Sequence, residues 1–145
     1  MTLTSKVKAF INKNIVDWVD YTVAHECRME ARYNGLPEHL VEGIVTKKDG
    51  YMGAVVKNTY KIKGKKKNVP IGRLVNDGWG KGGYDIFGKP VLRWVDMSGN
   101  VHFATKVHHP GFKGYHFMES GKIKGLRKFR KYTKEQMQNR MEWIS

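Results

Sequence analysis

The chain has 145 residues, with 27 Lys and Arg against 13 Asp and Glu and a formal net charge of +14. This length is typical of a single domain that buries roughly 68–70% of its unfolded surface, so a core needs no disulfide or metal. The positive charge favours nucleic acid, an acidic protein lumen or an anionic surface as partner, and it repels further copies of the chain.

Cys27 is the single cysteine, and one cysteine cannot build a disulfide framework. A small buried residue is favoured over a nucleophile at this position. No run approaches 18 apolar residues, and the N-terminus lacks the apolar stretch and cleavage site of a secretory signal. We therefore expect a soluble protein with no membrane partner, made in a reducing cytoplasm.

Residues 4–33 form the first predicted element. Apolar residues recur there at steps of three and four, as on one face of an amphipathic helix. Gly35 is a plausible left-handed cap, and Pro37 blocks continuation. We expect a helix over residues 1–33 that lies across a sheet.

Residues 40–46 and 51–59 are predicted strands, because Asp49-Gly50 between them is a strong two-residue hairpin signal. Residues 61–67 follow with five lysines, a composition that predicts a solvated loop or strand tip. The run from Val69 to Trp79 is expected to return as a short strand, with Pro70 favouring an edge.

Residues 76–90 contain five glycines and predict a long loop that carries Trp79, Tyr84 and Phe87. Residues 91–95 and 101–107 alternate polar and apolar positions around a turn, which predicts a second hairpin. The sheet is thus expected to occupy residues 40–107. Residues 122–145 are expected to hold a basic segment and then a short helix from about Lys134 to Trp143, because Thr133 and Gln136 resemble a capping box.

Four histidines raise the question of a metal site. His108, His109 and His116 with His102 are candidate zinc ligands, but adjacent residues on an extended chain point to opposite faces. A histidine-metal nuclease would need a further histidine on a following helix, and the C-terminal segment has none. We expect no metal and no cofactor.

Other enzyme motifs are weaker still. No GxSxG occurs, and His25 is two residues from Cys27, a spacing that does not bring two side chains together on a helix. The glycines of residues 78–88 fit no phosphate-binding motif, so a flexible loop explains them. Basic and aromatic residues interleave along residues 121–134, which suits nucleic-acid binding and a solvated basic face equally well.

The order of these segments resembles the tail-completion or neck proteins of long-tailed phages and related archaeal viruses. The resemblance runs through GLPEHLVEGI, YMGAVVKNT, VPIGRLVNDGW and YDIFGKPVLRW to VHFATKVHHPGFKGYHFM. The last stretch matches a signature of Val-x-His-Pro-Gly-x-Lys-Gly-x-x-Phe. Its members are Val107, His109, Pro110, Gly111, Lys113, Gly114 and Phe117. One departure is Asn76-Asp77-Gly78-Trp79, which stands where the family has glutamate–x–glycine–threonine.

The resemblance implies an α+β fold with a long N-terminal helix on a curved antiparallel sheet. It also implies a non-enzymatic virion protein that assembles, as a ring, where the head connector meets the tail tube. Its partners would be further copies, neighbouring neck or tail proteins, and the genomic DNA in the lumen. Trp79, Tyr84 and Phe87 are candidate subunit contacts, since aromatic residues are common hot spots.

Two basic segments are candidate contacts to DNA or to acidic proteins, and either contact would relieve the self-repulsion of the chain. The candidates are Lys61, Lys63, Lys65, Lys66, Lys67, Lys122, Lys124, Arg127, Lys128, Arg130 and Lys131. A free-standing nucleic-acid-binding protein is the main alternative, and a histidine-metal nuclease is the second. For His109 we expect a hydrogen bond that fixes the turn at Pro110 and Gly111, with Phe117 anchored in the core.

Overall fold

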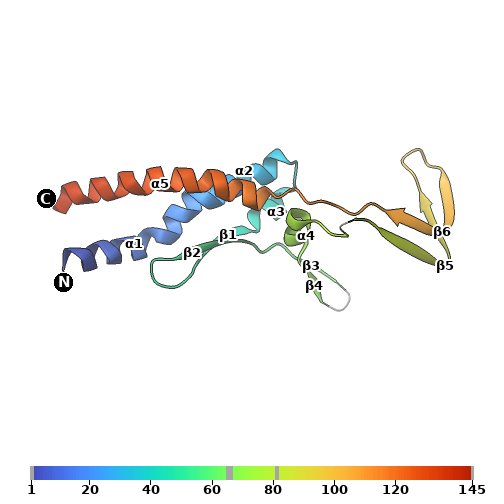
Figure 1. Cartoon of the computed structure of the whole chain (residues 1–145), viewed down its shortest axis with the longest axis horizontal. Coiled ribbons are helices and arrows are strands. Elements are labelled where there is room, and N and C mark those ends of the chain that lie inside the picture. Colours follow the sequence, from blue (N-terminus) through green and yellow to red (C-terminus); the bar gives the residue numbers. More distant parts are fainter. Residues whose placement is uncertain (1, 65–66, 81, 145) are drawn as a thin grey trace. The chain divides into compact units, whose positions relative to one another are not determined.

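A computed structural model describes residues 2–64, 67–80 and 82–144, with the backbone alone at 84, 89, 90 and 141–144. The fold is α+β with a helix near each end, as predicted, and its strands form small antiparallel sheets (Figure 1). The chain divides into two compact units. We call Met1–Asn76 with Tyr115–Ser145 the body unit, and Asp77–Gly114 the ribbon unit.

Most helices and strands belong to the body unit. They are α1 (Leu3–Val19), the π-helix η1 (Asp20–Ala24), α2 (His25–Tyr33), α3 (Glu38–Glu42), β1 (Ile44–Lys48), β2 (Ala54–Asn58), β3 (Ile62–Lys63), β4 (Asn68–Val69), α4 (Ile71–Asp77) and α5 (Phe117–Ile144). The ribbon unit contains β5 (Tyr84–Val95) and β6 (Val101–His109).

The predicted N-terminal helix is confirmed over its whole length, as α1, η1 and α2 in succession. The Thr2 hydroxyl caps the start of this helix by accepting from the Ser5 amide. Gly35, just after the end of the helix, has a φ of +74°. Inside the π turn the Thr22 hydroxyl donates to the Trp18 carbonyl at 2.7 Å. The helix lies along the β1–β2 hairpin (Figure 1), where the Asn12 side chain accepts from the Met52 amide at 2.9 Å.

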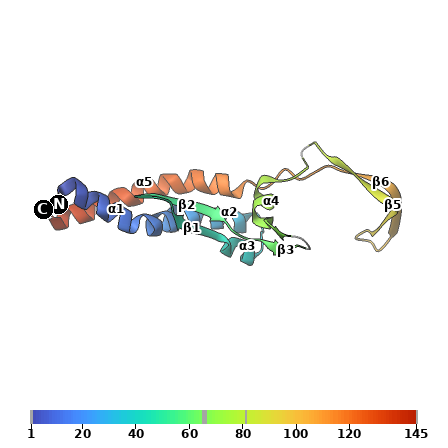
Figure 2. The ribbon, with the colours of Figure 1, turned by 90° about the horizontal axis from the view of Figure 1, so that it is seen from below.

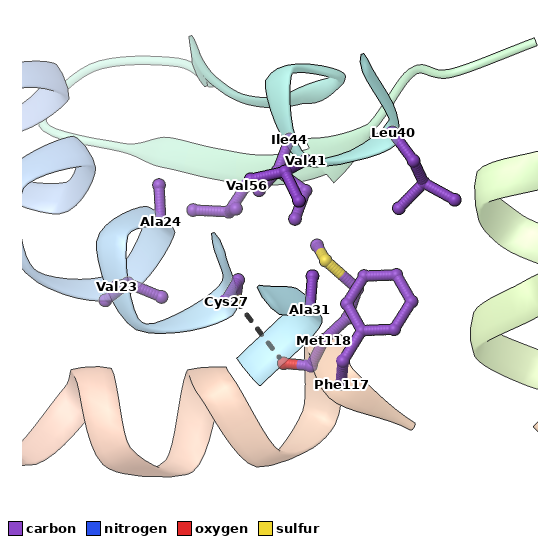
Figure 3. Close-up of a cluster of buried hydrophobic side chains, with 10 residues drawn as sticks. All are labelled: Val23, Ala24, Cys27, Ala31, Leu40, Val41, Ile44, Val56, Phe117 and Met118. Atoms are coloured by element: carbon purple, nitrogen blue, oxygen red, sulfur yellow. Dashed lines mark hydrogen bonds between the residues drawn. The ribbon is translucent and has the colours of Figure 1, made fainter. Parts of the chain in front are cut away.

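The hydrophobic core lies in the body unit, between the N-terminal helix, the β1–β2 hairpin and the start of α5 (Figure 3). Its fully buried members include Phe117, Leu40, Ile44, Val41 and Cys27. Burying a side chain such as Phe117 contributes about 1.5–3 kcal/mol relative to leaving it exposed. The expected anchoring of Phe117 in the core is therefore confirmed.

Two glycines let α5 approach the N-terminal helix closely (Figure 2). A Cβ on Gly121 would lie 2.4 Å from the Cys27 Cα, and a Cβ on Gly125 would lie 2.5 Å from the Val23 Cα. The Cβ of any other residue would collide with the backbone of the N-terminal helix, so these positions require glycine.

The expected C-terminal helix is present but much longer than predicted, because α5 begins at Phe117 and runs for 28 residues. The capping box was wrong: Thr133 lies inside the helix, where its hydroxyl donates to the Phe129 carbonyl at 2.8 Å. Its first turn is capped from a distance instead, since the Met118 amide donates to the Asn76 side chain at 2.9 Å.

Three further expectations are corrected. Residues 38–42 form α3 before the strand begins at Ile44, and residues 71–77 form α4 where we expected a strand. The Leu74 amide donates to the Pro70 carbonyl, so Pro70 stands just before the helix, a position where its missing N–H does no harm. The predicted loop of residues 76–90 is interrupted, because β5 begins at Tyr84.

The strands do not join into one sheet over residues 40–107. They form three separate two-stranded antiparallel sheets, β1–β2, β3–β4 and β5–β6. The first hairpin is present as predicted, but its connection takes five residues between the paired Lys48 and Ala54. Gly50 and Met52 both have positive φ in that connection. The second predicted hairpin is confirmed as β5–β6.

Candidate assembly surfaces

Five residues of the signature region, Pro110 to Gly114, follow β6 in the ribbon unit. We call them the signature turn. The Gly111 amide donates to Nδ1 of His109 at 3.0 Å, the turn-fixing hydrogen bond that we expected. Gly111 has a φ of +80° and Gly114 one of +84°, so glycine serves at both bends. Val107 of β6 pairs with Ile86 of β5. Strand β6 ends at His109, two residues later than expected.

A short bridge holds this turn in place. Trp79 and Phe112 exchange two backbone hydrogen bonds of 2.9 and 2.8 Å, and their rings lie 4.8 Å apart. A Cβ on Gly111 would stand 2.0 Å from the Gly80 carbonyl oxygen, and one on Gly78 would stand 2.2 Å from the Phe112 oxygen. The glycines around Trp79 thus allow two backbone segments to touch, and they do not form a loose loop.

Asn76 organises the start of α5 in the body unit. This side chain is buried; its amide oxygen accepts from the Met118 amide, and its Nδ2 donates to Glu119 at 3.0 Å. The backbone carbonyl of Asn76 accepts from the His116 amide, and that of Val75 accepts from Tyr115. Sequence reasoning missed this role, because nothing in the sequence pairs residue 76 with residue 118.

Strands β5 and β6 make a two-stranded ribbon whose side chains alternate between two faces. Val95 pairs with Val101 and Arg93 pairs with Phe103, so these four share one face near the turn. We call Val95, Val101 and Phe103 the ribbon patch; they are 53%, 45% and 66% exposed. On the opposite face Trp94 stacks on His102, with ring centroids 5.4 Å apart.

Charges on the ribbon pair with each other. His102 contacts Asp96 at 2.7 Å, and Asp85 contacts His108 at 3.0 Å and Lys106 at 3.9 Å. The hydrogen bond from His102 holds the pKa of Asp96 below its ordinary value. Arg93 is also exposed, and it shares a face with the ribbon patch.

The three aromatic candidates for subunit contacts do not form one cluster in the described structure. Trp79 is exposed but packs on Phe112, and Phe87 is exposed and pairs across the ribbon with Lys106. The side chain of Tyr84 lies outside the described residues. The ribbon patch was not predicted as a contact surface, although its alternating apolar residues were the signal for it.

The second basic segment lies on α5 and not on a loop. Lys124 and Lys128 form ion pairs with Glu30 and Glu26 of α2, and the pKa of Lys124 is raised by its hydrogen bond to Glu30. Within the described part of the chain, three exposed side chains of this segment have no acidic partner. They are Arg127, Arg130 and Lys131.

The first basic segment includes β3, which pairs with β4. Lys61, Lys63 and Lys67 are exposed there. Lys65 and Lys66 lie outside the described residues. The expectation of a solvated strand tip is met for the described lysines, and exposed lysines of this kind suit a polyanion or plain solvent equally well.

An apolar groove opens between α1, η1, β2 and α5 of the body unit. It has a volume of about 390 Å³, and Ile15, Val19, Val23, Val55, Leu126 and Phe129 line most of it. Lys122 is the one charged residue of its lining. Lys122 was predicted as a contact to DNA or acidic protein, and the structure places it at this apolar surface.

The enzyme readings gain no support from these contacts. Among the described residues no group of three or more His, Cys, Asp and Glu is placed to hold a metal ion. Cys27 is buried, and burial raises the pKa of its thiol to about 11, so it stays protonated near neutral pH. Its Sγ contacts the Met118 carbonyl, as Figure 3 shows.

Among the described residues, no helix has both the length and the apolar character needed to cross a bilayer. Comparison with family models, with curated proteins and with solved structures found no match for this chain.

Proposed function

We propose that this chain is a structural protein of the virion neck, which joins the head connector to the tail tube by assembling into a ring. The main support for the proposal is the well-defined structure of the signature turn. His109, Gly111 and the Trp79–Phe112 bridge hold it, and it connects β6 to α5. The order of segments that resembles neck proteins supports the same function.

The exposed apolar surfaces also support an assembling protein. The ribbon patch and the groove are both apolar and open to solvent, which is typical of surfaces that bind other proteins. No catalytic residue, metal or cofactor enters the proposal. Its partners are other copies, the neighbouring neck and tail proteins, and the DNA that passes through the ring.

Virions made with and without the gene for this chain would test the proposal. We expect the chain in purified particles, at the junction between head and tail. Without it, heads and tails should accumulate separately. Intact particles that form without the chain, or particles that lack it, would contradict the proposal.

A second candidate is a nucleic-acid-binding protein, and Arg127, Arg130 and Lys131 favour it because they are exposed and have no acidic partner in the described structure. Each phosphate contact contributes about −0.9 to the slope of log K against log salt concentration. Replacing all three by Gln should then flatten the slope by up to about 3. Lys124→Gln and Lys128→Gln are matched controls, since Glu30 and Glu26 already neutralise these lysines.

This candidate predicts that the isolated chain binds DNA and that binding falls steeply with salt. Absence of binding at low salt would remove it. The same result would leave the neck proposal standing, because ring assembly can precede any DNA contact.

A further inference from the structure

A ring of identical subunits needs two different contact surfaces on each subunit. Head-to-tail contacts generate rings or filaments, whereas one self-complementary patch generates only a two-fold dimer. The described structure offers two exposed apolar surfaces that differ in shape. One is the ribbon patch and the other is the groove of the body unit.

The ribbon patch lies on one face of a two-stranded hairpin. An isolated hairpin of two strands is at best marginally stable in water, and it gains stability by packing a face against another element. In the described ribbon unit no hydrophobic side chain is buried, so nothing within that unit covers Val95, Val101 and Phe103. A partner surface of matching apolar character would supply what this hairpin lacks.

The groove is a concave surface with a buried floor. Ile15 and Val23 are 7% and 6% exposed, while Leu126 on the rim is 49% exposed. Its volume is about 390 Å³. Large apolar side chains that entered it would remove apolar surface from solvent on both sides.

Charge decides which partner fits. Residues 77–114 hold five of the 27 basic and three of the 13 acidic residues, a net charge of +2, which leaves +12 for the rest. Two body units therefore repel each other strongly, whereas the ribbon unit of another copy approaches a body unit with little repulsion. Of the two units, the ribbon unit is the one that the body unit of a second copy repels less.

We propose that the ribbon patch of one copy docks into the groove of the next copy, with Phe103 entering between β2 and α5. This contact is heterologous, and repeating it around a closed circle generates a ring. The inference rests on the proposed function, because it names the subunit contact of that ring.

Two single variants separate the two surfaces. Phe103→Lys places a charge on the ribbon patch, and Leu126→Lys places one on the rim of the groove. Each has a matched control. Met97→Lys changes a fully exposed residue at the ribbon turn, and Ile123→Lys changes an exposed residue of α5 that does not line the groove. Circular dichroism confirms that each variant is folded.

Native mass spectrometry of each variant and of an equimolar mixture then tests the contact. The wild type and both controls should form oligomers, and each of the two test variants alone should be monomeric. The mixture should form a one-to-one heterodimer and nothing larger, because only the ribbon of the Leu126→Lys chain and the groove of the Phe103→Lys chain remain intact.

Other outcomes overturn the inference. Assembly of Leu126→Lys like the wild type, with Phe103→Lys monomeric, would indicate a symmetric contact between ribbons. A mixture without heterodimer, or a wild type that is monomeric at every concentration, would also contradict it. If the chain were then still found in the virion neck, the proposed function would stand. If the chain were absent from the neck, the proposed function and this inference would both be contradicted.

Discussion

The body unit and the ribbon unit use their apolar residues in opposite ways. The body unit buries Phe117, Leu40 and Ile44 in a core and carries a net charge of +12. The ribbon unit exposes Phe103 and Val95, carries a net charge of +2, and has no buried hydrophobic residue among those described. The body unit therefore holds the hydrophobic core, and the ribbon unit exposes its apolar side chains to solvent.

This contrast bears on the self-association that we propose for a strongly basic chain. Like charges on the body units oppose contact, and screening at physiological salt acts over about 8 Å. A contact made through the ribbon unit, with its net charge of +2, meets less repulsion than a contact between two body units. Variants of the body unit should therefore change stability, and variants of the ribbon unit should change assembly.

The largest effect on stability is expected from Phe117→Ala. This fully buried side chain packs in the core, and its truncation should destabilise the body unit by about 3–5 kcal/mol. Urea unfolding followed by circular dichroism measures the change. Exposed Phe87→Ala is the matched control and should leave the unfolding free energy within about 0.5 kcal/mol. Equal effects of the two would contradict the contrast between the units.

Asn76→Ala should destabilise the body unit by about 1–3 kcal/mol, because the buried Met118 amide loses its hydrogen-bond acceptor. Asn139→Ala, on the exposed surface of α5, controls for the loss of an amide side chain. If Asn76→Ala lowered the free energy of unfolding no more than Asn139→Ala, the hydrogen bond between Asn76 and the start of α5 would contribute nothing to stability.

Asp20 adds a pH dependence to the body unit. Burial alone raises its pKa, but hydrogen bonds from Arg28 and Thr46 outweigh burial and hold the pKa below 3.8. A lowered pKa in the folded state means that the contribution is complete at neutral pH and is lost as pH falls below about 4. Asp20→Asn should therefore lower stability at pH 7 and flatten the acid limb of the stability profile. An unchanged acid limb would contradict this reasoning.

His109→Ala should have the smallest effect on the body unit. It removes the acceptor for the Gly111 amide, a hydrogen bond that contributes about 0.5–1.5 kcal/mol locally. We expect faster amide exchange at Gly111, weaker assembly and no change in metal content. A loss of bound metal in this variant would restore the metal reading that we set aside.

The sequence predicted the elements that local patterns govern. The apolar stripe of residues 4–33 indicated the N-terminal helix, and alternation around Asp96 to Asn100 indicated the β5–β6 hairpin. The hydrogen bond of His109 was also expected, because it joins residues two positions apart.

The elements that were missed depend on distant contacts. The first half of α5 was predicted as a basic segment because of its many lysines and arginines. Gly121 and Gly125, which lower helix propensity, are required there by close packing on Cys27 and Val23. The α4 helix is tied in place by the Gly72 amide, which donates to the Tyr60 carbonyl. Neither contact can be recognised from neighbouring residues in the sequence. The groove could not be predicted either, because its lining residues come from α1, β2 and α5.

Removing the ribbon unit tests the central claim most directly. The Tyr115 and His116 amides donate to the Val75 and Asn76 carbonyls, so a short glycine linker can replace residues 77–114 without opening the body unit. The measurement is the solution mass by light scattering, beside that of the wild type. We predict an oligomer for the wild type and a folded monomer for the variant. A variant that assembles to the wild-type subunit number would contradict the account.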